Sequence, residues 1–184
     1  MSMLRVIVLA TVVGLLSTAP AFAQRNRPRK RVSPHETVSA VIAGNEVKVT
    51  YGRPYSKNPR GTDIRKIWGS LVPYGKAWRL GADEATTIVL QKGIKIGDAA
   101  IPAGTYTLYL IPEENGGKLA FSKTVGRWGI PVDQKHDLVR VDVKKEALSP
   151  ALDQLAIAIE KADNGGALKI KWEDSQYSVN FTNG

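Results

Sequence analysis

The chain alternates apolar and polar residues with a period of two along most of its length. The pattern is clearest near the end of the chain, where Val139, Val141 and Val143 alternate with Arg140 and Asp142. Because successive side chains of a β-strand point to opposite faces of the sheet, this period is typical of half-buried strands. The alternation occurs at residues 37–42, 46–51, 88–90, 94–96, 104–111, 119–121, 138–143, 155–159, 168–172 and 177–182.

Short turns separate these segments, and no long amphipathic helix interrupts them. The Gly44-Asn45 pair between the first two segments is typical of a hairpin turn. We therefore predict an all-β domain, either an antiparallel β-sandwich or a partly closed barrel, with about nine strands in a meander and one long irregular loop. The chain has no cysteine. Its stability must come from a packed core, because no disulfide can support the fold.

Three segments are expected along the chain. Residues 1–23 combine one basic residue, an apolar run and the ending Ala21-Phe22-Ala23, which is the pattern of a cleavable signal peptide. The apolar run is shorter than the roughly 20 residues of a spanning helix, so an uncleaved anchor is the weaker alternative. Residues 24–32 are expected to form a basic flexible linker, and residues 33–182 a single β-rich domain. The mature protein is expected in an extracytoplasmic space, the periplasm, and without cysteine it is not a lipoprotein.

The formal net charge of +9 is concentrated at the start of the mature chain. Residues 25–31 contain five basic residues, whereas residues 32–184 contain 20 basic and 17 acidic residues. We expect no nucleic-acid partner, because the charge belongs mainly to a solvated tail of an exported protein. At most, this tail makes a weak contact with an anionic membrane surface.

Residues 53–86 break the alternation. This segment has 34 residues, little periodicity, and seven basic residues against three acidic ones. A long irregular segment inside a compact domain is usually functional or disordered. Tyr55, Trp68, Tyr74 and Trp78 favour an ordered loop packed against the sheet, since disordered segments rarely carry such aromatic surface.

Distinctive motifs occur in this loop and in the strands around it: SPHETV (33–38), VTYGRP (49–54), IWGSLVPYGKAWRLGADEATTI (67–88), IPAGTYTLYLIP (101–112), Trp128-Gly129 and LKIKWEDSQYSVNF (168–181). Together they resemble the bacterial family of exported proteins known as domain of unknown function 2911 (DUF2911), over residues 33–181. The resemblance implies an exported β-rich domain and brings no established activity. The family usually has threonine and asparagine where this chain has Leu80 and Asp83, so a role that needs those two polar groups does not carry over.

No cofactor, metal site or catalytic residue is assigned. The only histidines, His35 and His136, lie far apart and lack the spacing of metal-binding motifs, although one of them could join Asp83 and Glu84 in space. No serine occupies a G-x-S-x-G elbow, and a triad assembled in space with either histidine stays open. For Asp83 and Glu84, which point apart on an extended chain, the ordinary expectation is a salt bridge with Arg79.

The candidate ligand-binding residues bring aromatic, cationic and carboxylate groups together in the irregular loop. Aromatic rings stack on sugars, and guanidinium groups bind carboxylate or phosphate with two hydrogen bonds. The alternative is that the tryptophans anchor the loop and the arginines form local bridges. The candidate set is Arg53, Tyr74, Lys76, Trp78, Arg79, Asp83 and Glu84.

We therefore expect an exported, non-catalytic protein that binds a polar or anionic ligand of the cell envelope, such as a small molecule, glycan or peptide. One alternative is an extracytoplasmic hydrolase that uses a carboxylate or histidine base from residues 53–86. Another is a structural partner in an envelope assembly, with strand edges as its contact surface. Convergence of Glu84 and a histidine in one cleft would favour the hydrolase, and a fully packed loop would favour the structural role.

Overall fold

The computed structural model describes residues 32–59 and 61–184, which belong to one compact unit. The predicted signal peptide and all but the last residue of the predicted linker lie outside the described residues. The described part contains nine strands and no helix. It accordingly offers no helix with the length and apolarity to span a membrane.

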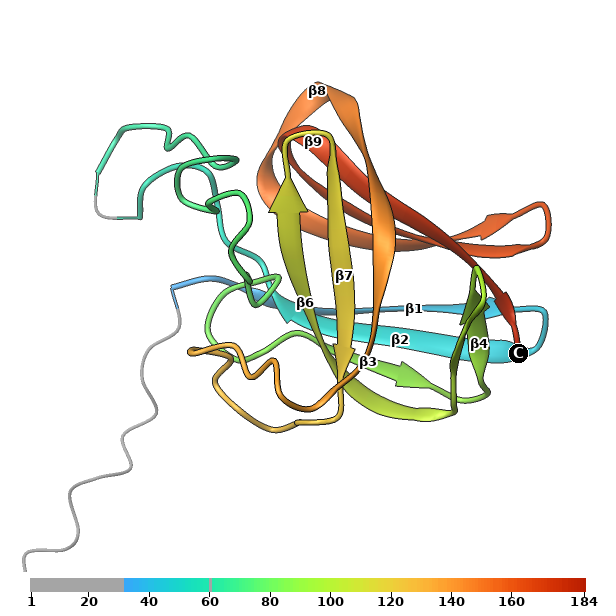
Figure 1. The fold of residues 1–184 in the computed structure, drawn as a ribbon. Helices are drawn as coiled ribbons and strands as arrows, with labels where there is room; N and C mark the ends of the chain where they lie inside the picture. Colours follow the sequence, from blue (N-terminus) through green and yellow to red (C-terminus); the bar gives the residue numbers. More distant parts are fainter. Residues whose placement is uncertain (1–31, 60) are drawn as a thin grey trace, which may run out of the picture. The chain divides into compact units, whose positions relative to one another are not determined.

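All nine strands belong to one antiparallel sheet, in the order β1-β2-β3-β6-β7-β8-β9-β4-β5 (Figure 1). β1 and β5 form its two edges, so the sheet is not closed into a barrel. The predicted all-β antiparallel class is confirmed. The strands are β1 (His35–Ile42), β2 (Asn45–Gly52), β3 (Thr87–Leu90), β4 (Ile94–Ile96), β5 (Ala99–Ile101), β6 (Gly104–Glu113), β7 (Gly116–Ser122), β8 (Asp137–Ala162) and β9 (Gly165–Asn183).

The predicted meander holds for seven of the strands, but β4 and β5 leave it. β3 pairs with β2 and β6, whereas β4 pairs with β5 and with the end of β9 at the other edge of the sheet. The fully buried Asn45 side chain fixes this crossing. It accepts a hydrogen bond from the Lys92 backbone N–H at 2.8 Å, and its amide donates to the Lys92 carbonyl and to Asn183 Oδ1, both at 3.1 Å.

Four of the predicted segments merge into the two longest strands, β8 and β9. Their pairing is irregular between Ala147 and Ala156, and Glu173 opposite has a φ of 53°. The irregularity bends the hairpin, so that β8 also packs against β1 and contacts β2. The Tyr51 hydroxyl on β2 accepts a hydrogen bond from the Ile157 backbone N–H of β8 at 2.8 Å.

The irregular segment contributes to the hydrophobic core. Ile67, Trp68, Val72 and Leu80 are each at most 4% exposed, and the Trp68 indole donates to the Trp172 carbonyl at 3.0 Å. Burying each such side chain stabilises the fold by about 1.5–3 kcal/mol. The described part of the loop is therefore ordered and packed, as its aromatic content predicted.

Candidate ligand-binding groove

A groove with a volume of about 1300 Å³ opens beside the irregular segment. The irregular segment supplies much of its lining through residues 54–55, 57–59, 61, 65, 71–72, 76–79 and 81–82, together with residues 130–132, Gln134, Asp153 of β8 and Trp172 of β9. Typical pockets for small molecules have volumes of about 300–1,000 Å³. The groove is therefore large enough for a ligand bigger than a single sugar or amino acid.

Stacked indoles form the aromatic part of the lining. The Trp78 ring stacks on Trp172 with centroids 5.7 Å apart and an interplanar angle of 22°, and Trp68 contacts both rings edge-on. The Trp78 backbone exchanges two hydrogen bonds with Leu110 of β6, at 2.7 and 2.9 Å. The sheet and the core thus hold the Trp78 side chain at the groove, while Trp68 is an anchor of the core.

Arg79 connects two loops by hydrogen bonds to backbone carbonyl groups. Its Nε donates to the Gly81 carbonyl at 3.3 Å, and its Nη1 donates to the carbonyls of Asp83 at 2.7 Å and Trp128 at 3.3 Å. Burial lowers the pKa of the guanidinium, and the nearby carboxylates of Asp83 and Glu84 oppose this effect. Its hydrogen-bond acceptors are neutral, so its positive charge is not neutralised by a direct ion pair within the described residues.

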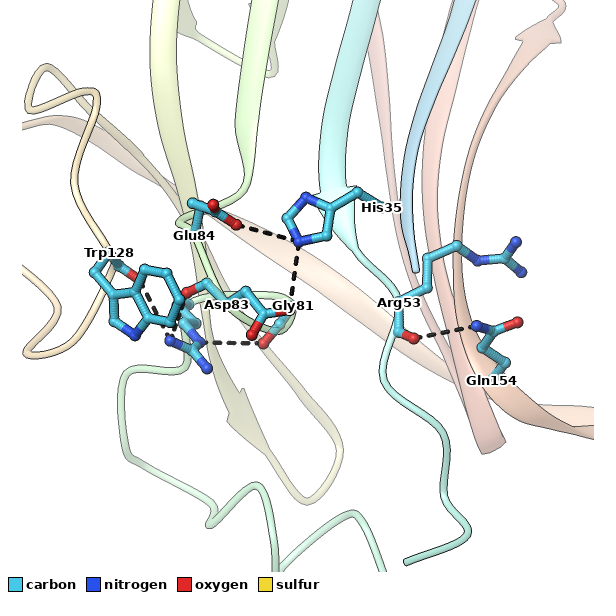
Figure 2. Close-up of polar contacts among 8 residues, drawn as sticks. His35, Arg53, Gly81, Asp83, Glu84, Trp128 and Gln154 are labelled. Carbon is cyan, nitrogen blue, oxygen red and sulfur yellow. Dashed lines mark hydrogen bonds and ion pairs between the residues drawn. The ribbon is translucent and has the colours of Figure 1, made fainter. Parts of the chain in front are cut away.

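The carboxylates of Asp83 and Glu84 contact His35 and, within the described residues, form no salt bridge with Arg79. The prediction of a salt bridge with Arg79 is therefore wrong. The His35 Nε2 atom lies 3.2 Å from Glu84 Oε2 and 3.5 Å from Asp83 Oδ2 (Figure 2). The end of β2 and the turn that carries Asp83 can approach closely because glycines, Gly52 and Gly81, lie where the two segments meet. A Cβ on Gly52 would lie 2.2 Å from the Ala82 carbonyl oxygen, and one on Gly81 would lie 2.9 Å from the Gly52 carbonyl oxygen.

The turn that carries these carboxylates has an unusual backbone. Leu80 and Asp83 have φ angles of 59° and 63°, in the left-handed region. Aspartate tolerates this region better than most residues, whereas leucine does not. The buried Thr86 hydroxyl donates to the Leu80 carbonyl at 2.8 Å and holds the turn in this conformation.

The structure separates the seven predicted ligand residues. Lys76, Trp78 and Arg79 line the groove, and the other four do not. Arg53 pairs with Glu36 at 3.0 Å and donates to the Leu155 carbonyl, and the Tyr74 hydroxyl accepts from Lys145 at 2.9 Å.

Several groove residues were missed by the sequence analysis. Lys57 and Arg65 were visible as charges of the loop, but nothing in the sequence assigned them to the same site as Lys76. Ile130 and Trp172 come from segments more than 40 residues away, with no pattern that links them to the loop. The other large apolar or aromatic lining residues that the sequence analysis did not assign are Val32, Tyr55, Leu71, Val72 and Val132.

The charges around the groove are unbalanced. Its lining contains four cations, Lys57, Arg65, Lys76 and Arg79, and a single carboxylate, Asp153. Between residues 32 and 184, with residue 60 left aside, none of the four cations forms an ion pair; Arg65 donates to the carbonyls of Tyr55 and Ser56 instead. A concave surface lined by one sign of charge attracts ligands of the opposite sign.

Neither histidine belongs to a nucleophilic triad or a metal site in the described part of the chain. His136 contacts Asp133 at 2.9 Å, and no serine hydroxyl hydrogen bonds to either imidazole there. His35 does meet Asp83 and Glu84, the combination that the sequence left open. Even so, no set of three or more described histidine and acidic side chains has the arrangement of a metal centre.

The fold and the groove define an all-β protein with one open antiparallel sheet and a cation-lined groove at its irregular loop. Residues 33–181 match the family described as "Protein of unknown function (DUF2911)", and the chain belongs to this family. The resemblance seen in the sequence motifs is thereby confirmed. No match was found among curated proteins or among solved structures.

Proposed function

We propose that this protein binds an anionic ligand of the cell envelope in the groove, without catalysing a reaction. The observation that carries the proposal is the set of four groove cations that lack carboxylate partners in the described part of the chain. Lys57 and Lys76 are exposed, so they meet an anion without first breaking an internal contact.

The physical chemistry of the groove supports weak to moderate affinity that depends on salt. Each exposed cation–anion contact contributes about 0.2–1 kcal/mol, so several must act together. An aromatic group of the ligand that stacks on Trp78 adds about 0.5–1.5 kcal/mol. Because ions screen exposed charges over about 8–10 Å at physiological ionic strength, added salt weakens the binding.

The proposal places the protein outside the cytoplasm, in the periplasm. Its support is the signal-peptide pattern of residues 1–23, and without cysteine the protein has no site for the lipid anchor of a lipoprotein. Protein recovered from the extracytoplasmic fraction should begin at Gln24, which N-terminal sequencing measures. A retained Met1 would contradict this location.

A pair of matched charge reversals tests the binding. The groove variant carries Lys57→Glu and Lys76→Glu, and the control carries Lys95→Glu and Lys144→Glu, two exposed lysines outside the groove. The probes are polyglutamate, polygalacturonate and polyphosphate. The binding of each probe is measured by the change in tryptophan fluorescence. We expect at least one probe to bind, with a Kd raised about tenfold in the groove variant, or about 1.4 kcal/mol.

The control variant has the same net charge as the groove variant, so it separates a site from general electrostatic attraction. Its Kd should rise less than twofold. The proposal fails when no probe binds, or when both variants lose affinity equally.

A hydrolase is the second candidate, favoured by the approach of His35 to Glu84 at 3.2 Å. Imidazole and carboxylate groups are the usual general acids and bases of enzymes. Wild type should then cleave one of a panel of chromogenic esters, phosphomonoesters and glycosides. His35→Asn and Glu84→Gln should abolish this cleavage, whereas Glu114→Gln, at an exposed position, should not. A wild-type protein that leaves the whole panel intact would remove this candidate.

A further inference from the structure

We infer that the ligand of the groove is an acidic peptide segment that also carries apolar side chains. This inference rests on the proposed function and names its ligand class. The first observation is the apolar rim of the groove. Of nine large hydrophobic residues exposed in the described chain, four line this one groove, with exposures of 41–69%: Val32, Tyr55, Leu71 and Ile130.

A concentration of exposed apolar side chains marks a contact surface, whereas single exposed ones are common everywhere. Glycans and inorganic anions have no apolar side chains that could cover Leu71 and Ile130. A peptide with leucine or phenylalanine residues covers them and removes this surface from water. The gain is about 25 cal/mol for each Å² buried.

The second observation concerns the groups that would bind sugar hydroxyls. Only three lining residues have carboxylate or amide side chains, and all three already make hydrogen bonds. Asp153 Oδ1 accepts from the Ser56 hydroxyl and from the Lys57 N–H, Gln134 Oε1 accepts from Arg140, and Asn58 donates to Asp63. A hydroxyl-rich glycan therefore finds few of the acceptors that it needs, while carboxylates find cationic donors.

The third observation is how the cations are presented. Lys57 and Arg65 come from one segment of the lining, and Lys76 and Arg79 come from another. In both Arg65 and Arg79, the Nε atom and one Nη atom donate to backbone carbonyls. The remaining Nη atoms, Nη1 of Arg65 and Nη2 of Arg79, have no hydrogen-bond partner within the described residues. These N–H groups are donors for carboxylates, and their positions on two segments suit a ligand with several acidic residues.

The experiment measures fluorescence anisotropy of a labelled 12-residue peptide of glutamate, leucine and phenylalanine. Two matched peptides replace glutamate by glutamine, or leucine and phenylalanine by serine. A galacturonate oligomer of equal charge is the glycan probe. We expect the acidic apolar peptide to bind at least tenfold more tightly than each of the other three.

Variants at the rim connect this preference to the groove. Leu71→Ser with Ile130→Ser should weaken binding of the acidic apolar peptide about tenfold and leave the galacturonate oligomer unchanged. Val89→Ser, an exposed valine of β3 outside the groove, is the control and should change neither Kd. Thermal unfolding confirms that all variants are folded.

Each other outcome overturns the inference. Tighter binding of galacturonate, or equal binding of the serine peptide, shows that the ligand is an anion without apolar groups, and the proposed function survives. If no anionic probe binds, the proposed function and the inference fail together. If the rim variants bind the peptide as well as Val89→Ser does, the peptide binds elsewhere.

Discussion

Replacing Gly52 by alanine should disturb the contact on which the groove and the His35 cluster both depend. Gly52 is the last residue of β2 and is paired with His35. Its Cβ would lie 2.2 Å from the Ala82 carbonyl oxygen and 3.1 Å from His35 Nε2. Carbon and carbonyl oxygen atoms do not approach within about 3 Å, so the turn that follows Gly81 must move by roughly 1 Å.

The expected cost follows from two opposing effects. Overpacking of this kind destabilises a protein by about 1–3 kcal/mol. Where the backbone conformation suits alanine, replacing glycine stabilises the protein by about 0.4–1 kcal/mol, because alanine lowers the conformational entropy of the unfolded chain. We expect a net loss near 1.5 kcal/mol. With a urea m-value of about 2 kcal/mol/M for a domain of this size, the midpoint falls by roughly 0.7 M.

Gly97→Ala provides the comparison. A Cβ on Gly97 meets no atom within 4 Å, but its φ of 55° is unfavourable for alanine. This variant should lose about 1 kcal/mol through backbone conformation alone, with unchanged binding of anions in the groove. Gly52→Ala should weaken that binding, because Gly81 and Ala82 line the groove. A Gly52→Ala midpoint equal to or above that of wild type would refute the argument.

Two further predictions concern buried polar groups. Asn45→Ala leaves the Lys92 backbone groups and Asn183 without their partner, and it should lower the free energy of unfolding by about 2–4 kcal/mol in urea denaturation, with Thr37→Ala as an exposed control near zero. Burial raises the pKa of Tyr51 from 10.0 to about 12 and also raises the pKa values of Tyr109 and Tyr177. Because the folded pKa lies above the unfolded value, stability is complete below pH 10 and is lost as the pH rises through 12. Phenolate absorbance should therefore appear at a higher pH in the native protein than in the protein unfolded in urea. Titration curves that coincide would contradict this prediction.

Local patterns were sufficient to predict the strands. The first hairpin is an example: the alternation around Val38 and Val49 fixes which side chains face the core, and the two residues pair across the hairpin. A tight turn was predicted at Gly44-Asn45, but it lies one residue earlier: Ala43 and Gly44, with φ angles of 46° and 74°, form it, and Asn45 is already the first residue of β2. Both signals lie within a few residues along the chain, so the sequence alone contains them.

The position of β4 and β5 was not predictable in this way. It depends on Asn45 and on its partners Lys92 and Asn183, which lie 47 and 138 residues from Asn45 along the chain. Because asparagine beside glycine is common in turns, the sequence suggests a turn residue at Asn45 and gives no sign of its role as a buried bridge. The convergence of His35 on Glu84 depends likewise on a glycine contact between distant segments.

The groove shows why a loop without regular secondary structure can still form a defined site. Ile67, Val72 and Leu80 insert into the core, and Trp78 is fixed to β6 by two backbone hydrogen bonds. The anchored positions alternate with the cationic ones, so each lysine or arginine between residues 65 and 79 has a buried neighbour within a few residues. Order in the loop therefore comes from apolar burial, while its charges remain available at the surface of the groove. A loop held by ion pairs would have used the same cations for its own stability, and no positive groove would remain.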